Sequence, residues 1–520
     1  MSAGARLPAA DVRDELLENS EFFKPQSELA TYPAMASLHA ISSNTRSSFQ
    51  STPPITSLEI GRYTMGSEQI EAEQTVASTM GVEQFIAEGR ASHENLFPLS
   101  SSHLNEAPSI PCNPNRLAHA IVNLSPAFFS LNMGTGITSI LLHNLPYNAG
   151  WLQRLAIVIF ILNIVIFALL VVGNVVRFVR YQGLLASINT HPLAGMFWGC
   201  LPMGFATIVN MVAFVCVPAW GYRWAQVALG LWWIDVLLSI LVNLGMIFMM
   251  FTRQTHTADT MSAAWLLPIV SSVVAAASGG VVASALMPFN PILARSTVIV
   301  SYVVWGTGVP LACFIMTLWM YRTAVGGVPE PGALPSVFLP LGPCGQGSFG
   351  IMLLGRVVRD LAYEHGVGFA ILPEGVANDD SILRMADAVY AGGLVTGLVL
   401  WGLGFCWYIL AMAITLDYGL RQTAFFSPKS FSIGWTTYTF PIGVWATATT
   451  ILATELDSPA FKVLGTIVSL QVALNWLYIF IMTMWKMWNG TIFIAPELAK
   501  FGGKPPLRWG GEVDRDVEKA

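Results

Sequence analysis

Long apolar runs alternate with short polar connections over most of the chain, beginning near Arg116. Each run is long enough to cross about 30 Å of hydrocarbon as a helix that rises about 1.5 Å per residue. The pattern therefore predicts ten membrane-spanning helices, at residues 122–143, 151–176, 194–217, 227–251, 263–287, 297–321, 333–355, 388–416, 433–454 and 460–485. An even number of crossings places both ends of the chain on the same side of the membrane.

The first 115 residues differ from the rest, because they are rich in Ser, Thr, Glu and Ala and contain no apolar run of spanning length. They also lack the charged and apolar regions of a secretory signal peptide. We expect a polar, disordered, cytosolic tail at 1–115, a transmembrane domain at 116–490 and a cytosolic C-terminal tail at 491–520. A second hypothesis makes the N-terminal tail a regulatory segment that folds onto the membrane domain or is phosphorylated.

Basic residues in the connections set the expected orientation. Arg177, Arg253 and Arg322 fall on the predicted cytosolic side, as the positive-inside rule requires. The longest predicted connection, 356–387, falls outside; it is mostly acidic but also carries Arg356 and Arg359. Both termini are therefore predicted to be cytosolic, and the sequon 489–491 is expected to stay unglycosylated.

Prolines recur in alternate apolar runs. The segment 339–350 alone holds two prolines and four glycines. Proline removes a backbone donor, and broken helix inside a membrane survives only against protein or a watery cavity. The helix-kink candidates are Pro126, Pro202, Pro268, Pro340, Pro343 and Pro441. This repeat predicts an all-α membrane protein of five helical hairpins, with an inner ring of five kinked helices around a central pore. Alternatively, the prolines only adjust helix tilt.

Composition narrows the class of protein. The chain is 54% hydrophobic and 11% charged, with a mean hydropathy of +0.58, whereas soluble domains carry about 25% charged residues. The net charge of −5 argues against a nucleic-acid partner. The six cysteines form no CxxC pair, so neither a disulfide framework nor a metal site is expected. No cofactor is expected either.

The predicted inner segments contain no Asp, Glu, Lys or Arg, so a pathway through them would be neutral. A proton-coupled pump uses intramembrane acids or histidines, whereas broken helices offer free backbone N–H groups and positive helix ends, which suit anions. We therefore predict passage of a small anion, moved passively or nearly so. Candidate pore-lining or anion-binding residues are Asn132, Thr135, Asn210, Ser271, Gln346, Ser348, Thr436 and Thr439. The alternative for each hydroxyl is a bond to its own helix.

Two further residues stand out within the apolar runs. Asp235 is a buried charge in the fourth run, to be interpreted as a coupling acid or as a structural lock between an outer and an inner helix. Phe440 precedes Pro441, which biases its backbone away from helix. Its ring either plugs the pathway or serves as an ordinary core aromatic.

Four short stretches carry a resemblance to a known family: 132–137 (NMGTGI), 197–204 (FWGCLPMG), 341–350 (LGPCGQGSFG) and 438–443 (YTFPIG). Over about 116–490 the chain resembles the tellurite-resistance/dicarboxylate transporter family of plant slow anion channels, a bacterial tellurite-resistance homologue and fungal malate permeases. It looks most like the fungal sulfite efflux pumps. Cys344 departs from the family's glycine-rich motif.

The resemblance implies ten helices around a pore, a homotrimer with one pore per protomer, and occlusion of the pore by Phe440. It also implies that the cargo is sulfite (HSO₃⁻ or SO₃²⁻), exported across the plasma membrane. The competing hypotheses are a malate permease or a less selective anion channel of the same fold. A membrane enzyme or receptor is disfavoured, because the inner segments hold no catalytic set of side chains.

Overall fold

The computed structural model describes residues 116–501, apart from 258–259, 331, 371–378, 423–424, 426 and 428–429. The chain divides into two units, Met1–Ser109 and Ile110–Ala520, and all described residues belong to the second. The predicted tail at 1–115 and residues 502–520 lie outside the described residues. The described part is helical throughout, without strands.

Five long helices have largely exposed faces: α4 (Gly150–Arg180), α8 (Tyr222–Thr252), α10 (Pro291–Gly326), α12 (Asp379–Arg421) and α14 (Pro459–Trp488). Only 22–33% of the residues in their most apolar stretches are buried. The exposed side chains there are large and apolar, as at Leu169, Leu241 and Val399, which suits contact with lipid.

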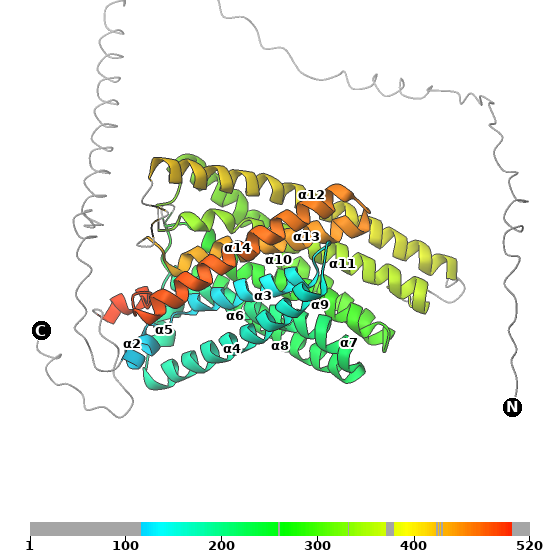
Figure 1. The fold of residues 1–520 in the computed structure, drawn as a ribbon, viewed down its shortest axis with the longest axis horizontal. Coiled ribbons are helices and arrows are strands. Elements are labelled where there is room, and N and C mark those ends of the chain that lie inside the picture. The colour runs from blue at the N-terminus through cyan, green and yellow to red at the C-terminus, as the bar shows by residue number, and fades with distance from the viewer. Residues whose placement is uncertain are drawn as a thin grey trace, which may run out of the picture. The chain divides into compact units, whose positions relative to one another are not determined.

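Five other helices are buried: α3 (Phe129–His143), α6 (Cys200–Met211), α9 (Leu266–Leu286), α11 (Leu341–His365) and α13 (Phe440–Glu455). The share of buried residues in the most apolar stretch is 78% for the segment of α6, 94% for that of α11 and 100% for that of α9. Each buried helix packs against an exposed helix that follows it in the chain, namely α4, α8, α10, α12 and α14 in turn. In Figure 1, α12 runs along one edge and α4 and α8 along the other, with α3, α6 and α9 between them in this view.

A short 3-10 helix leads into each buried α-helix: η1 (Pro126–Phe128), η2 (Ala194–Gly199), η4 (Ala263–Trp265), η5 (Leu334–Phe338) and η7 (Ile433–Tyr438). The repeat seen in the sequence is therefore a repeat of local structure, a tight turn that opens into an α-helix. The N–H groups of a helix's first turn have no intrahelical partner, so a proline there removes nothing that the helix needs.

The predicted kink prolines occupy these junctions. Pro202 and Pro268 are the third residues of α6 and α9, Pro340 caps α11, and Pro441 is the second residue of α13. Pro343 is the third residue of α11, and Pro126 opens η1. The prolines thus lie where α-helices begin, whereas a kink in the middle of a helix was expected.

Eight helical segments among the described residues are long and apolar enough to cross a membrane. The expected count of ten is not confirmed, because α3 and α13 have 15 and 16 residues, fewer than the roughly 20 that a spanning helix needs. Their α-helical parts are short because the preceding residues, up to Phe128 and Tyr438, are wound as 3-10 helix.

Two predicted boundaries are displaced. The predicted connection 356–387 is wrong at its start, because α11 continues to His365 and carries Arg356 and Arg359 on the helix. The packed chain also extends past 490: η8 (Pro496–Phe501) lies against α5 (Leu184–Thr190), and Leu498 is buried. The buried side chain of Leu498 and the ion pair between Glu497 and Arg177 hold η8 against the helices. This segment is therefore part of the folded domain.

Candidate functional site

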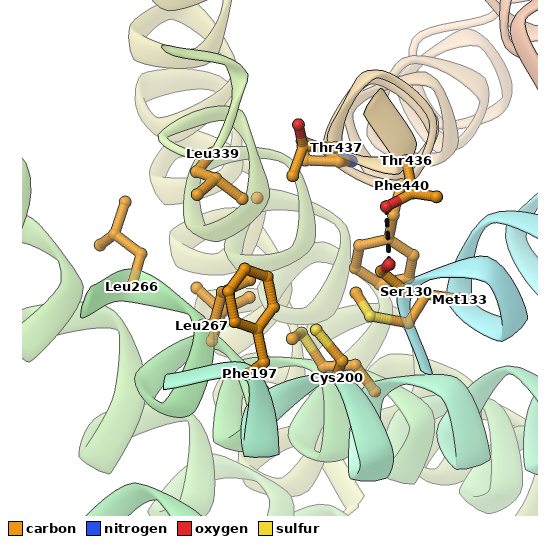
Figure 2. Close-up of a pocket in the computed structure, with 14 residues that line it drawn as sticks. Ser130, Met133, Phe197, Cys200, Leu266, Leu267, Leu339, Thr436, Thr437 and Phe440 are labelled. Carbon is orange, nitrogen blue, oxygen red and sulfur yellow. Dashed lines mark hydrogen bonds between the residues drawn. The ribbon is translucent and has the colours of Figure 1, made fainter. Parts of the chain in front are cut away.

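A cavity lies at the beginnings of the five buried helices. Its volume is about 30 Å³, room for roughly two water molecules. Figure 2 shows the rings of Phe197 and Phe440 facing this space. It is lined by Ser130, Met133, Phe197, Cys200, Met203, Leu266, Leu267, Val270, Leu339, Gly342, Thr436, Thr437, Phe440 and Pro441. We call it the N-terminal cavity, because these residues lie in or just before the first turns of the helices.

A second cavity lies further along the same helices. Its volume is about 20 Å³, and we call it the middle cavity. It is lined by Ile137, Ile140, Thr207, Asn210, Phe214, Val274, Val281, Gln346, Phe349, Phe440, Val444 and Thr447. All five buried segments contribute to both cavities, and apart from Phe440, which lines both, the residues of the middle cavity follow those of the N-terminal cavity in each segment. The five buried helices therefore run in the same direction past the two cavities.

Phe440 lines both cavities. It is the first residue of α13, and its side chain is only 4% exposed. Pro441 follows it and Thr439 caps the helix before it, so the junction of η7 with α13 sets the position of its ring. Among the described residues, Phe440 is the one that contributes to the linings of both spaces.

The backbone around the N-terminal cavity differs from the free N–H groups that broken helices were expected to offer. At each junction an amide donates to a carbonyl within the preceding tight turn. Examples are Cys200 to Phe197, Leu266 to Ala263 and Gly342 to Leu339. What converges on the cavity is therefore the positive end of five helix dipoles, carried mostly by bonded amides.

Three of the eight polar candidates line a cavity. Thr436 lines the N-terminal cavity, and Asn210 and Gln346 line the middle cavity. Thr436 Oγ1 lies 2.6 Å from Ser130 Oγ, a hydrogen bond that joins η7 to α3 and is drawn in Figure 2. The amide oxygen of Asn210 is buried and accepts no hydrogen bond within the described chain. It is therefore an unsatisfied polar atom on a residue that lines the middle cavity.

The other five candidates line neither cavity, and their side chains bond within or between helices. The pairs are Asn132 Nδ2 to Asn163 Oδ1 (2.7 Å), Thr135 Oγ1 to the Leu131 carbonyl (2.8 Å), Ser271 Oγ to the Pro268 carbonyl (2.6 Å), Ser348 Oγ to the Gly397 carbonyl (2.7 Å) and Thr439 Oγ1 to the Thr436 carbonyl (2.8 Å). The sequence showed which segments are polar but not how each helix is rotated.

Sequence reasoning missed most of the apolar lining. Met133, Cys200 and Met203 bring three sulfur atoms to the N-terminal cavity, and Phe197 brings a second ring. The sequence did contain a signal for part of this lining. Phe197, Cys200 and Met203 lie within about one helical turn of Pro202, one of the prolines singled out in the sequence.

Asp235 lies away from both cavities, fully buried on α8. Neither of its carboxylate oxygens has a hydrogen-bonding partner within the described residues. The expected lock between an outer and an inner helix therefore finds no support in the contacts of this side chain. Among the same residues, no group of three His, Cys, Asp or Glu side chains could hold a metal ion.

Comparison with known proteins shows the family to which the chain belongs. Residues 123–484 match the family model SLAC1, described as voltage-dependent anion channel. The chain is 40% identical over 375 residues to the sulfite efflux pump SSU1 of Arthroderma benhamiae, and 41% identical over 375 residues to that of Arthroderma otae. Each alignment covers 72% of this chain and 93% of the relative. The malic acid transport protein of Schizosaccharomyces pombe is 24% identical over 375 residues, which is 72% of this chain and 79% of that protein.

Members of this family are transporters and channels rather than enzymes, which confirms the expectation that the chain is a transport protein. The resemblance noted in the glycine-rich and proline-containing stretches is confirmed as well. The family match covers most of the chain and all five buried helices. On these grounds the chain belongs to the SLAC1 family of anion channels.

Proposed function

We propose that this protein exports sulfite across the plasma membrane, through a path ringed by the five buried helices. The observation that carries the proposal is that all five line both cavities, in the same order along each helix. The five exposed helices form the outer wall, each paired with the buried helix before it. Helices α3 and α13 cross as shorter segments enclosed by protein, where irregular backbone is tolerated.

The electrostatics of the path favour an anion. The N-terminal ends of five α-helices line the N-terminal cavity, and the positive ends of their dipoles favour negative charge there. None of the residues that line the two cavities is acidic or basic. A small anion therefore meets a favourable potential without a fixed cation, which lets it leave again.

Phe440 closes the path. Its ring separates the two cavities, and each cavity by itself has room for only one or two water molecules. Movement of this ring joins the two spaces into one path, so Phe440 is the proposed gate.

Sulfite is favoured over malate as the cargo. The relatives that share 40–41% identity with this chain are named sulfite efflux pumps, whereas the malic acid transport protein shares 24%. A dicarboxylate carries a second charge that calls for a fixed cation, and the lining of neither cavity contains one.

Both termini are proposed to be cytosolic and the assembly a homotrimer with one path per protomer. In this orientation the N-terminal cavity faces the cytosol, where sulfite enters. The sequon at Asn489 tests this orientation, because glycosylation there would place the end of α14 outside the cell.

Transport is tested in cells that carry the gene or a deletion of it. Deletion is expected to lower the release of sulfite into the medium and to sensitise the cells to added sulfite. Uptake of labelled malate is measured in parallel. Unchanged sulfite release together with gene-dependent malate uptake would replace the proposed cargo by a dicarboxylate.

A further inference from the structure

A cluster of charged side chains joins α11, α12 and α13 near the far end of the buried helices. Arg356 Nη1 lies 3.3 Å from Glu455 Oε1, and Arg359 Nη1 lies 3.9 Å from Glu455 Oε2. The hydroxyl of Tyr390 donates to Glu455 Oε2 at 2.7 Å, and the Arg359 guanidinium lies 4.1 Å from the centre of the Tyr390 ring. Glu455 is 6% exposed, whereas Arg356 and Arg359 are 36% and 32% exposed.

Glu455 lies where a negative charge is disfavoured. It is the last residue of α13, where the helix dipole presents its negative end and an acidic side chain is disfavoured. Two arginines and one hydroxyl hold it there. The Glu455 carboxylate thus lies between two guanidinium groups, whose N–H donors can bind any oxyanion in the same way.

Arg356 and Glu455 lie on the faces of α11 and α13 that line the middle cavity, whereas Arg359 lies round α11 toward Tyr390 of α12. Arg356 follows Phe349 by seven residues, two turns or about 10 Å along α11. Glu455 follows Val444 by eleven residues, three turns or about 16 Å along α13. Residues at these spacings share one face of a helix, so Arg356 and Glu455 stand beyond the middle cavity, toward the C-terminal ends.

We propose that Arg356 and Arg359 form an oxyanion-binding site at the outlet of the path, which Glu455 occupies until an exported anion displaces it. This rests on the proposed function, because it takes the buried helices to surround the path. The ligand class is a small oxyanion, with sulfite or bisulfite as the cargo. No covalent step is involved; one negatively charged group exchanges for another on the two guanidinium groups.

The parallel direction of the five helices explains why an outlet needs such a site. Their positive ends attract an anion at the N-terminal cavity, and their negative ends repel it where it leaves. Two arginines at the outlet offset that repulsion. Between transport events Glu455, together with Asp360, neutralises the two arginines, so they do not hold external anions permanently.

Asp360 also contacts the arginines, with its Oδ2 3.7 Å from Arg356 Nε and its Oδ1 3.2 Å from Arg359 Nη2. Its side chain is 23% exposed and lies on the same helix as both arginines, so it moves with them. Glu455 belongs to another helix and is the group that can separate from the arginines when α11 and α13 shift.

The test measures how sulfite added outside inhibits the release of radiolabelled sulfite from preloaded cells that express the full chain. Glu455→Gln keeps the shape and the bond from Tyr390 but removes the competing charge. We expect half-inhibition at a several-fold lower external sulfite concentration. Arg356→Gln is expected to raise that concentration several-fold. Asp380→Asn is the matched control, because it alters the exposed ion pair of Arg384 and Asp380, whose side chains are 80% and 69% exposed. It should not change the half-inhibiting sulfite concentration.

Glu455→Asp, whose carboxylate reaches less far, covers the case in which Glu455→Gln does not fold, and it should shift inhibition in the same direction. Equal inhibition constants in the wild type, Glu455 variants and Arg356→Gln would overturn the outlet site. So would a shift seen only when sulfite is added to the cytosolic face of excised patches. If the wild type releases nitrate but not sulfite, the proposed cargo fails, and the same titration with nitrate still decides whether the outlet site exists.

Discussion

Arg177 and Glu497, 320 positions apart in the chain, form a 2.7 Å ion pair from which solvent is wholly excluded. The same guanidinium donates to the carbonyl of Val122 at 2.8 Å and to that of Leu124 at 3.0 Å. These carbonyls directly precede η1, which leads into α3 and the N-terminal cavity. The C-terminal segment is thereby tied to the chain that positions Ser130.

We expect Arg177→Met to destabilise the protein by about 3–5 kcal/mol, because Glu497 is left buried without a countercharge. Arg177→Lys should rescue only part of the loss, since an ammonium group cannot reach all three acceptors in one plane. Thermal unfolding of the full chain in detergent measures both. Arg421→Met is the control: its pair with Asp417 is 75% and 60% exposed, so a loss under about 1 kcal/mol is expected. Similar losses at the two sites would contradict this account.

Phe440→Ala should raise anion flux several-fold, because removal of the ring joins the N-terminal and middle cavities. Phe197→Ala is the matched control, since Phe197 lines only the N-terminal cavity, and its flux should stay close to that of the wild type. Loss of a buried phenylalanine costs about 3–5 kcal/mol, so flux is normalised to folded protein at the cell surface. Unchanged flux in well-expressed Phe440→Ala would mean that the ring is not the gate.

Asp235→Leu should stabilise the protein, because it replaces a fully buried carboxyl, which has no hydrogen-bonding partner in the described part of the chain, by an apolar side chain of similar size. Leaving such a group unsatisfied costs about 1–3 kcal/mol, and the substitution recovers part of it. We expect a higher unfolding temperature in detergent and sulfite flux near that of the wild type. A collapse of flux that Asp235→Asn shares would assign the acid a role in transport.

Gly345→Ala should destabilise the contact between α11 and α13, because a Cβ there would lie 2.5 Å from the backbone nitrogen of Trp445. Backbone cannot move aside as a flexible side chain can, so a loss of about 1–3 kcal/mol is expected. Gly342→Ala, in the same motif, is the control, since its Cβ would stand 3.6 Å from the nearest atom, Val270 Cγ1. The fraction of monodisperse protein after extraction compares the two; equal yields would count against close backbone packing as the reason for Gly345.

The sequence alone determined the class of protein, eight of the helices that are long and apolar enough to cross a membrane, and the alternation of exposed with buried helices. These follow from local chemistry: apolar length predicts a crossing, and a proline fits the first turn of an α-helix, where its missing N–H is not needed. Phe440 could be singled out because its special position beside Pro441 is local as well.

Only the tertiary structure decided which polar groups face the cavities and which distant residues meet. Thr436, Asn210 and Gln346 line them while Ser348 turns to Gly397, because the rotation of each helix is set by its neighbours and not by its own sequence. Arg177 with Glu497 and Arg356 with Glu455 likewise come together through packing between elements that the chain order does not reveal. A contact between two helices depends on both surfaces at once, and a linear pattern describes only one.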